Sequence, residues 1–374
     1  MSLQKSNWVP GLDLVRFSAA LLVAWYHLAF LPNAPTVPSE VIAILGPGQG
    51  IPALSVTAWF GWIGVEIFFV MSGFVIALSS ENQGALRFLK GRFLRLYPAV
   101  WICATLTLLI ELTARPLAGL VAPYLHSVTL YPNFPYIDVV YWTLGVEMAF
   151  YAVVFVMLLL GRRAWIARSF FVLGLASTIF WALWIVEEWA GLRILHSVPQ
   201  RLLQLSLLQH GCFFAIGGIL WLRKQRPAKG FETALLALFV ATALVEIGFH
   251  TRSSETGGPI VVPALIWLGF LILMAISVFR PMQVRSDRVA YAIRLAGLMT
   301  YPLYLLHQVC GATLMFWLRQ AAVGPVSSLA ITLCAMIGLA AIVAALLEPG
   351  CRRYAERLMV MFGAMAHRRF ARAS

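Results

Sequence analysis

The chain has 374 residues, of which 61% are hydrophobic and only 11% are charged. A soluble domain is closer to half apolar and a quarter charged, so this composition excludes a soluble globular protein and indicates one that crosses a membrane many times. The formal net charge is +13. It predicts no nucleic-acid partner, because the cytoplasmic loops of membrane proteins accumulate Lys and Arg.

Hydropathy predicts an all-α polytopic integral membrane protein with about ten transmembrane helices. Pro, Gly and charged residues concentrate in the connections between the apolar runs, as expected for loops. The predicted spans lie at about 12–31, 58–79, 96–113, 139–160, 165–187, 202–222, 232–250, 260–279, 295–318 and 328–348.

The charges in the connections predict the orientation. The segment 32–57 contains no Lys or Arg, whereas the next connection carries Arg87, Lys90, Arg92 and Arg95. Basic and basic-poor connections then alternate to the end of the chain, and an even number of spans keeps both termini on one side. Because cytoplasmic loops carry the positive charge, both termini are predicted to be cytoplasmic.

The chain divides into a transmembrane domain, residues 1–350, and a basic cytoplasmic tail, residues 351–374. The tail mixes arginines with apolar residues, so we expect an interfacial helix that lies along the membrane surface and is attracted by anionic lipids. Five cysteines occur without CxxC spacing. That pattern predicts neither disulfides nor a metal.

The first predicted span carries three ionisable residues on one face. Arg16 and His27 are eleven positions apart, so their directions differ by only about 20°, and Asp13 lies three residues before Arg16. The rise from Arg16 to His27 is about 16 Å, roughly half the hydrocarbon thickness. A lone histidine can be an interhelical hydrogen bond, but ionisable groups are costly in lipid, and three along one stripe indicate function.

The predicted orientation separates the polar residues by depth. Asp13, Arg16, Arg92 and Arg95 fall at the cytoplasmic ends of their spans, where cations suit a phosphorylated donor. A second group is predicted further out: His27, Glu66, Glu147 and His210 in the outer half and His307 nearer the middle. Imidazole beside carboxylates suits proton transfer.

Five short motifs occur in one order along the chain. They are Arg16 and His27 separated by ten residues, the run 64–77 (GVEIFFVMSGFVIA), Arg92 and Arg95 followed by Pro98, Trp142 to Glu147 (WTLGVE), and Tyr301, Tyr304 and His307 (YPLYLLH). Together they resemble membrane-bound acyltransferase family 3, which includes lipopolysaccharide O-antigen acetylases. Thr143 stands where the family motif has Ser. The resemblance covers essentially the whole chain.

The resemblance implies an O-acyltransferase of the bacterial cytoplasmic (inner) membrane. It would move an acyl group, by family default acetyl, from acyl-CoA to a hydroxyl of a surface glycan or lipid-linked sugar, with acetyl-CoA as co-substrate and no tightly bound cofactor. His27 would be the base or a transient acyl carrier. Glu147 would orient an imidazole or the acceptor, and Asp13 is assigned to the same catalytic set. Arg16, Arg92 and Arg95 would hold the CoA phosphates. A substrate-binding or supporting role falls to Glu66, Trp142, Tyr301, Tyr304 and His307.

Structural interpretations stay open beside these assignments. Arg92 and Arg95 stand where positive-inside anchoring alone would place them, Glu66 can pair across helices, and Asp13 can simply neutralise Arg16. Acylation of a small metabolite or antibiotic is an alternative reaction, and a proton-coupled transporter is an alternative class. The predicted depth of His27, nearer the outer face, favours the glycan. The sequence indicates no oligomeric state.

Overall fold

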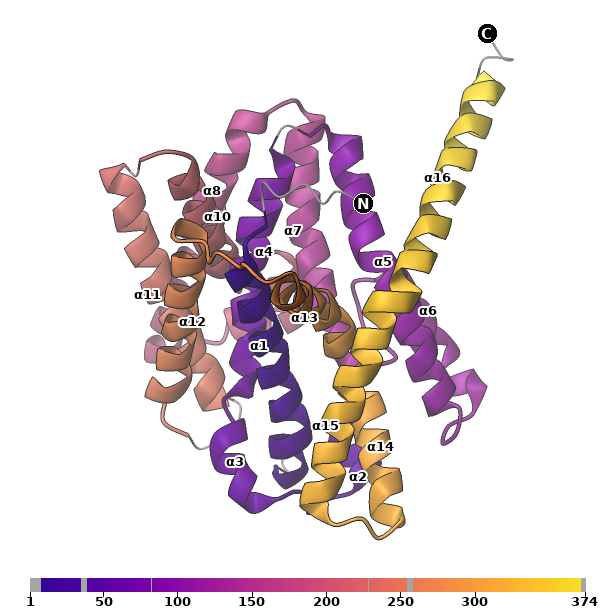
Figure 1. Cartoon of the computed structure of the whole chain (residues 1–374). Coiled ribbons are helices and arrows are strands. Elements are labelled where there is room, and N and C mark those ends of the chain that lie inside the picture. Colours follow the sequence, from indigo (N-terminus) through magenta and orange to yellow (C-terminus); the bar gives the residue numbers. More distant parts are fainter. Residues whose placement is uncertain (1–7, 35–38, 82, 228, 254–257, 371–374) are drawn as a thin grey trace.

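The computed structural model describes residues 8–34, 39–81, 83–227, 229–253 and 258–370. Within these ranges the chain is helical and forms no β-strand (Figure 1), which confirms the predicted all-α class. The longer helices are α1 (Pro10–Trp25), α4 (Gly64–Ser80), α5 (Ala85–Glu111), α7 (Trp142–Leu159), α8 (Arg163–Ala190), α10 (Gly211–Gln225), α11 (Gly230–Ser253), α12 (Val261–Phe279), α13 (Asp287–Leu306), α14 (Val309–Gln320), α15 (Pro325–Ile342) and α16 (Glu348–Phe370). Shorter helices are α2 (Glu40–Leu45), α3 (Pro52–Ala58), α6 (Val121–Thr129) and α9 (Gln200–Leu205).

Nine helical segments in the described ranges are long and apolar enough to cross a membrane. They are Pro10–Asn33, Pro52–Ser80, Ala85–Glu111, Val139–Leu159, Trp165–Ala190, Gly230–Ser253, Val261–Phe279, Asp287–Leu306 and Pro325–Met361. Each overlaps one of the ten predicted spans, so the chain is a multi-pass membrane protein. The side of the membrane that each end faces stays a prediction.

The predicted span 202–222 is not one continuous helix. α9 ends at Leu205 and α10 begins at Gly211, and Leu207 between them has a left-handed backbone with φ of 61°. The backbone carbonyl of Gln209, freed by the break, accepts a hydrogen bond from the Trp181 indole of α8 at 3.0 Å. Hydropathy does not detect such a break, because the residues on both sides are apolar.

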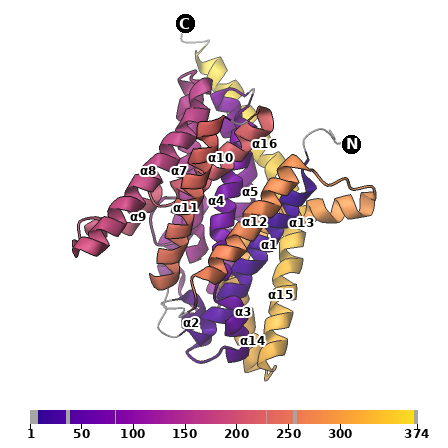
Figure 2. The ribbon, with the colours of Figure 1, turned by 90° about the vertical axis from the view of Figure 1, so that its left-hand side faces the viewer.

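The prediction of a single helix over 295–318 was wrong. α13 ends at Leu306 and α14 starts at Val309, and Figures 1 and 2 together show α13 lying across the other long helices. The His307 ring lies 3.1 Å from the Leu303 carbonyl and 2.9 Å from the Tyr304 carbonyl through Nδ1. A side chain that bonds backbone carbonyls competes with the helical ladder, and the chain changes direction at this residue.

Close backbone contact joins α4 and α10 at the centre of the bundle. A Cβ atom placed on Gly73 would lie 2.2 Å from the Phe214 carbonyl oxygen, and one on Gly217 would lie 2.0 Å from the Val70 carbonyl oxygen. Only glycine permits this approach, which is a common way for membrane helices to pack. The contact between α4 and α10 therefore fixes the position of α4, the helix that contains Glu66 and Ser72.

α15 continues into α16 through a π-helical turn, Val343–Leu347, so that one long helix runs to the end of the described chain. In Figure 1 the C-terminal part of α16 extends beyond the rest of the bundle. Most of the predicted tail is therefore helical, and residues 371–374 lie outside the described ranges. Its placement along the membrane surface stays a prediction.

Candidate functional site

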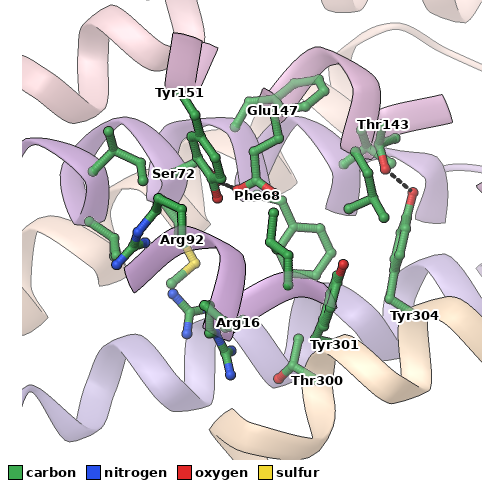
Figure 3. Close-up of a pocket in the computed structure, with 18 residues that line it drawn as sticks. Arg16, Phe68, Ser72, Arg92, Thr143, Glu147, Tyr151, Thr300, Tyr301 and Tyr304 are labelled. Atoms are coloured by element: carbon green, nitrogen blue, oxygen red, sulfur yellow. Dashed lines mark hydrogen bonds between the residues drawn. The ribbon is translucent and has the colours of Figure 1, made fainter. Parts of the chain in front are cut away.

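Three arginines and one carboxylate surround a small cavity between α1, α4, α5, α7 and α13 (Figure 3), which we call the arginine chamber. Its volume is about 120 Å³. Arg16 comes from α1, and Arg92 and Arg95 share one face of α5 because they are three residues apart. The polar residues lining the chamber are Arg16, Ser72, Arg92, Arg95, Thr143, Glu147, Tyr151, Thr300, Tyr301 and Tyr304.

The charge of the arginine chamber is positive. Arg92 lies over the rings of Phe88 and Tyr151, and its buried Nε has no hydrogen-bond partner in the described part of the chain. The Arg95 guanidinium is 3.8 Å from a carboxylate oxygen of Glu348 on α16. Three guanidinium groups against one lining carboxylate leave unmatched donors, which is the arrangement that binds phosphate or carboxylate groups.

Glu147 belongs to the arginine chamber. Ser72 donates a hydrogen bond to its Oε1 atom, and the Tyr151 hydroxyl, one turn further along α7, is also hydrogen-bonded to this carboxylate. The residue does not line the cavity that contains His27. The sequence-based expectation of a Glu147 carboxylate beside the outer imidazoles is therefore corrected: the structure groups Glu147 with the arginines.

A wider cavity of about 370 Å³, which we call the entrance cavity, adjoins the arginine chamber and shares Arg16 and Arg95 with it. Asp13 lines this entrance cavity and accepts a 2.8 Å hydrogen bond from the Trp8 indole, while Arg294 of α13 lies over the Trp8 ring. Asp13 thus lies among the arginines rather than near His27. No local sequence motif marks Arg294, so the sequence did not predict it at this cavity.

His27 forms a pair with His307. The distance from His27 Nδ1 to His307 Nε2 is 2.8 Å. His307 Nδ1 faces two backbone carbonyls, which can only accept, so this nitrogen carries the proton and Nε2 of the neutral ring is an acceptor. His27 Nδ1 then donates to His307, so the neutral His27 ring has its lone pair on Nε2. A backbone hydrogen bond with Val23 also holds the ring of His27. The arrangement supplies a base whose orientation is fixed by a second imidazole.

Two carboxyl groups hold the helix break next to His307. Asp138 Oδ2 accepts the Val309 backbone N–H at 3.0 Å at the start of α14. Glu40 Oε2 accepts the Gln308 side-chain amide at 3.2 Å and the Val139 backbone N–H at 3.0 Å. These contacts join α2, the short turn Val139–Tyr141 that precedes α7, and the start of α14 around the break. Neither carboxyl group was singled out from the sequence, because each lies in a connection without a recognisable motif.

A third cavity, of about 380 Å³, contains His27 and is called the histidine cavity. Val65 and Tyr304 line both this cavity and the arginine chamber, so they form the partition between the two. The Tyr304 hydroxyl lies 3.0 Å from the Thr143 hydroxyl. Polar and aromatic residues line the histidine cavity: Tyr26, His27, Trp62, Glu66, Phe134, Trp142, Gln200, Arg201, Gln204, Gln209, His210, His250 and Tyr304.

The other predicted residues divide between the two cavities. Trp142 lines the histidine cavity, and its carbonyl accepts a 3.0 Å hydrogen bond from Arg201. Tyr301 lines the arginine chamber, and its buried hydroxyl has no hydrogen-bond partner within the described ranges. Glu66 lines the histidine cavity beside His210. The structure therefore places most of the predicted residues in two adjacent cavities, one cationic and one containing imidazoles. Asp13 lines the entrance cavity instead, and His307 lines neither of the two but contacts His27.

A family model described as an acyltransferase domain matches residues 9–346. The match includes every residue that lines the arginine chamber and the histidine cavity. No curated protein and no solved structure matches the chain.

Proposed function

Because the chain belongs to acyltransferase family 3 and is a membrane acyltransferase, we propose that it moves an acyl group from acyl-CoA to a hydroxyl of a surface glycan. Acetyl-CoA is the proposed donor, and the bacterial inner membrane, with both chain ends in the cytoplasm, is the proposed location. The observation that most supports this proposal is that the arginine chamber and the histidine cavity meet at Tyr304. An anionic donor and a basic imidazole thereby face one another across a single partition.

The donor end of the proposal rests on the arginines. The entrance cavity and the arginine chamber share Arg16 and Arg95, and Arg92 adds an unmatched buried donor. Guanidinium groups bind phosphate oxygens through paired N–H donors. The phosphates of CoA would occupy this end, and the narrow pantetheine arm would extend toward Tyr304. The small volume of the arginine chamber suits such an arm better than a second bulky substrate.

His27 supplies the base in this reaction. Its Nε2 takes the proton of the acceptor hydroxyl while the hydroxyl oxygen attacks the thioester carbonyl carbon. The new C–O bond forms, the C–S bond breaks, and the CoA thiolate takes the proton from the imidazolium. The His27 Nδ1–H bond to His307 Nε2 is kept throughout, so the imidazolium retains an acceptor while it carries the extra charge. Transient acylation of His27 Nε2 uses the same lone pair.

The acceptor end of the proposal rests on a fourth cavity of about 580 Å³ that shares Gln200, Gln209 and His250 with the histidine cavity. Its apolar wall contains Phe180, Trp181, Trp184 and Phe249. Aromatic rings beside amide and imidazole groups offer packing for the C–H face of a sugar and hydrogen bonds for its hydroxyls. This lining favours a glycan over a small anionic metabolite.

The test uses the full-length chain in sealed membrane vesicles with acetyl-labelled acetyl-CoA. Transfer of label to the surface glycan, located by mass spectrometry, is expected for the unaltered chain. His27→Ala should abolish transfer and leave the amount of protein in the membrane unchanged. Retained transfer in this variant would contradict the proposed base. Movement of an unmodified solute without acylation would instead indicate a transporter.

A further inference from the structure

A compact group of three ionisable side chains lies behind the histidine cavity. Glu66 of α4, His210 at the start of α10 and Glu246 of α11 have exposed fractions of only 4%, 3% and 2%. Their ligand-type atoms all lie within 4.8 Å of one another, and His210 Nδ1 is 2.6 Å from Glu246 Oε1. Three helices thus direct one nitrogen and two carboxylate donors into the same small space.

The polar atoms of this group are poorly satisfied by the protein. Glu66 Oε2, Glu246 Oε1 and both ring nitrogens of His210 are buried without a hydrogen-bond partner among the described residues, since the short His210–Glu246 contact lacks hydrogen-bond geometry. The Cys212 thiol is a weak donor to the other oxygen of Glu246, at 3.7 Å. Unsatisfied buried carboxylates are expensive, so these four atoms indicate a missing ligand.

The charge around the group indicates the sign of that ligand. In the ionised forms that bind a cation, the two carboxylates beside a neutral imidazole would carry −2. No Arg or Lys of the described chain lies within ion-pair distance of Glu66 or Glu246. Arg201 faces the same cavity, but its donors are engaged by Pro132, Trp142, Gln204 and Tyr136. The ring of His250, which is tilted against Trp62 with 4.1 Å between the ring centroids, is a further imidazole lining the same cavity.

We propose that Glu66, His210 and Glu246 bind one divalent transition-metal ion. One imidazole and two carboxylates match the donors that Zn²⁺ and Mn²⁺ accept, and the +2 charge balances the two carboxylates. Ligand atoms at about 2.1 Å from one ion lie up to roughly 4 Å apart, so a side-chain shift of under about 1 Å brings the three donors together. The cysteine pattern predicted no metal, and these ligands could not be linked by spacing because they lie on three separate helices.

The position of the ion follows from its ligands. Glu66 and His210 line the histidine cavity, whereas Glu246 lines the adjoining fourth cavity, the one walled by Phe180, Trp181, Trp184 and Phe249. The ion therefore sits in the wall between them, ties α4, α10 and α11 together and presents open coordination positions to the cavities. That the ion holds an acceptor hydroxyl at those positions rests on the proposed function. That the ion binds at all is independent of the proposed function.

The experiment measures metal directly, without acyl-CoA. Full-length protein in detergent is stripped with a chelator, dialysed against ZnCl₂ or MnCl₂ and then against metal-free buffer, and its metal content is measured by mass spectrometry. About one ion per chain is expected, together with a higher midpoint of thermal unfolding than in the stripped protein. Glu246→Gln and Glu66→Gln keep size and remove charge, and each should lower retention at least tenfold.

Glu232→Gln is the matched control, since Glu232 is a buried carboxylate on the same helix α11 that pairs with Arg226. This variant should retain the ion. A stripped wild-type chain that takes up neither metal overturns the proposal, as does undiminished retention by a folded Glu246→Gln variant. The outcome is separable from the proposed function, because His27→Ala should abolish acyl transfer and still bind the ion.

Discussion

His27 Nδ1 lies 2.8 Å from His307 Nε2, and the two residues are 280 positions apart in the chain. The contact joins the π-helical turn after α1, Tyr26–Phe30, to the break between α13 and α14. The orientation of the proposed base is therefore set by a neutral imidazole, whereas the carboxylate first considered for that role, Glu147, lies among the arginines. A neutral partner avoids placing an additional buried charge beside the base.

His307 is a positioning residue, and its replacement should act on kcat. In His307→Ala the Nδ1–H of His27 loses its acceptor, so we expect kcat to fall by roughly 10²-fold with little change in the KM for acetyl-CoA. His307→Gln, whose amide oxygen can accept the same hydrogen bond, should recover part of the loss. Steady-state kinetics over a range of pH would show a changed profile for the alanine variant. An equal rise in KM would indicate a structural collapse instead.

Arg92 should contribute to binding the phosphates of the donor. A charge-assisted hydrogen bond is worth about 1.5–3 kcal/mol, so Arg92→Ala should raise the KM for acetyl-CoA by roughly 10- to 100-fold. The same variant should not differ from wild type with acetyl-pantetheine, which lacks the nucleotide phosphates. Arg115→Ala is the control, because Arg115 pairs with Glu111 away from the arginine chamber. Equal losses with both donors would refute a phosphate contact.

Gly217 should be intolerant of any side chain. A Cβ atom there would lie 2.0 Å from the Val70 carbonyl oxygen, and α4 and α10 would have to separate. Gly217→Ala should therefore destabilise the detergent-solubilised protein by about 1–3 kcal/mol, measured by thermal unfolding. Gly338→Ala, in an open position on α15, serves as the comparison and should be neutral or slightly stabilising. Equal unfolding midpoints for the two variants would contradict the close packing.

The sequence predicted the helical class, the approximate positions of nine apolar segments and the separation of Arg16, Arg92 and Arg95 from His27, which line different cavities. It did so because hydropathy and loop charge report the depth of a residue. They do not report the rotation of a helix about its axis, so Glu147 was predicted at a plausible depth and grouped with the wrong neighbours. The breaks at Leu207 and His307 were missed for a related reason: apolar residues flank both, and each break is stabilised by contacts with distant segments.

The group formed by Glu66, His210 and Glu246 shows the same limit. Glu66 and His210 were each noted as ionisable residues at similar depth, but nothing in the spacing linked them to Glu246 on α11. Only the packing of α4 against α10 and of α10 against α11 brings the three together. Long-range contacts between apolar helices therefore determine the site, and a single sequence carries no periodic signal for them.

Stability should fall as pH rises through neutrality, because of Glu40. Burial raises the pKa of this carboxyl group from 4.5 to about 7, so the folded chain holds its proton more tightly than the unfolded chain does. The resulting stabilisation is complete below about pH 4.5 and is lost as the pH rises through about 7. A shift of this size corresponds to at most about 3 kcal/mol. Burial and the nearby Glu40 also raise the pKa of Asp138, which acts in the same direction.

Glu40→Gln tests this explanation, because the amide cannot ionise and its oxygen can still accept the Val139 N–H. Thermal unfolding in detergent between pH 5 and pH 8 should show a falling midpoint for the unaltered chain and a clearly flatter profile for the variant. Asp138 remains, so a residual slope is expected. The same buffers can be used to follow kcat: Glu40 bonds the Gln308 amide next to His307, so loosening of the helix break above pH 7 should lower kcat in the unaltered chain more than in Glu40→Gln. Identical unfolding profiles for both proteins would rule Glu40 out as the titrating group.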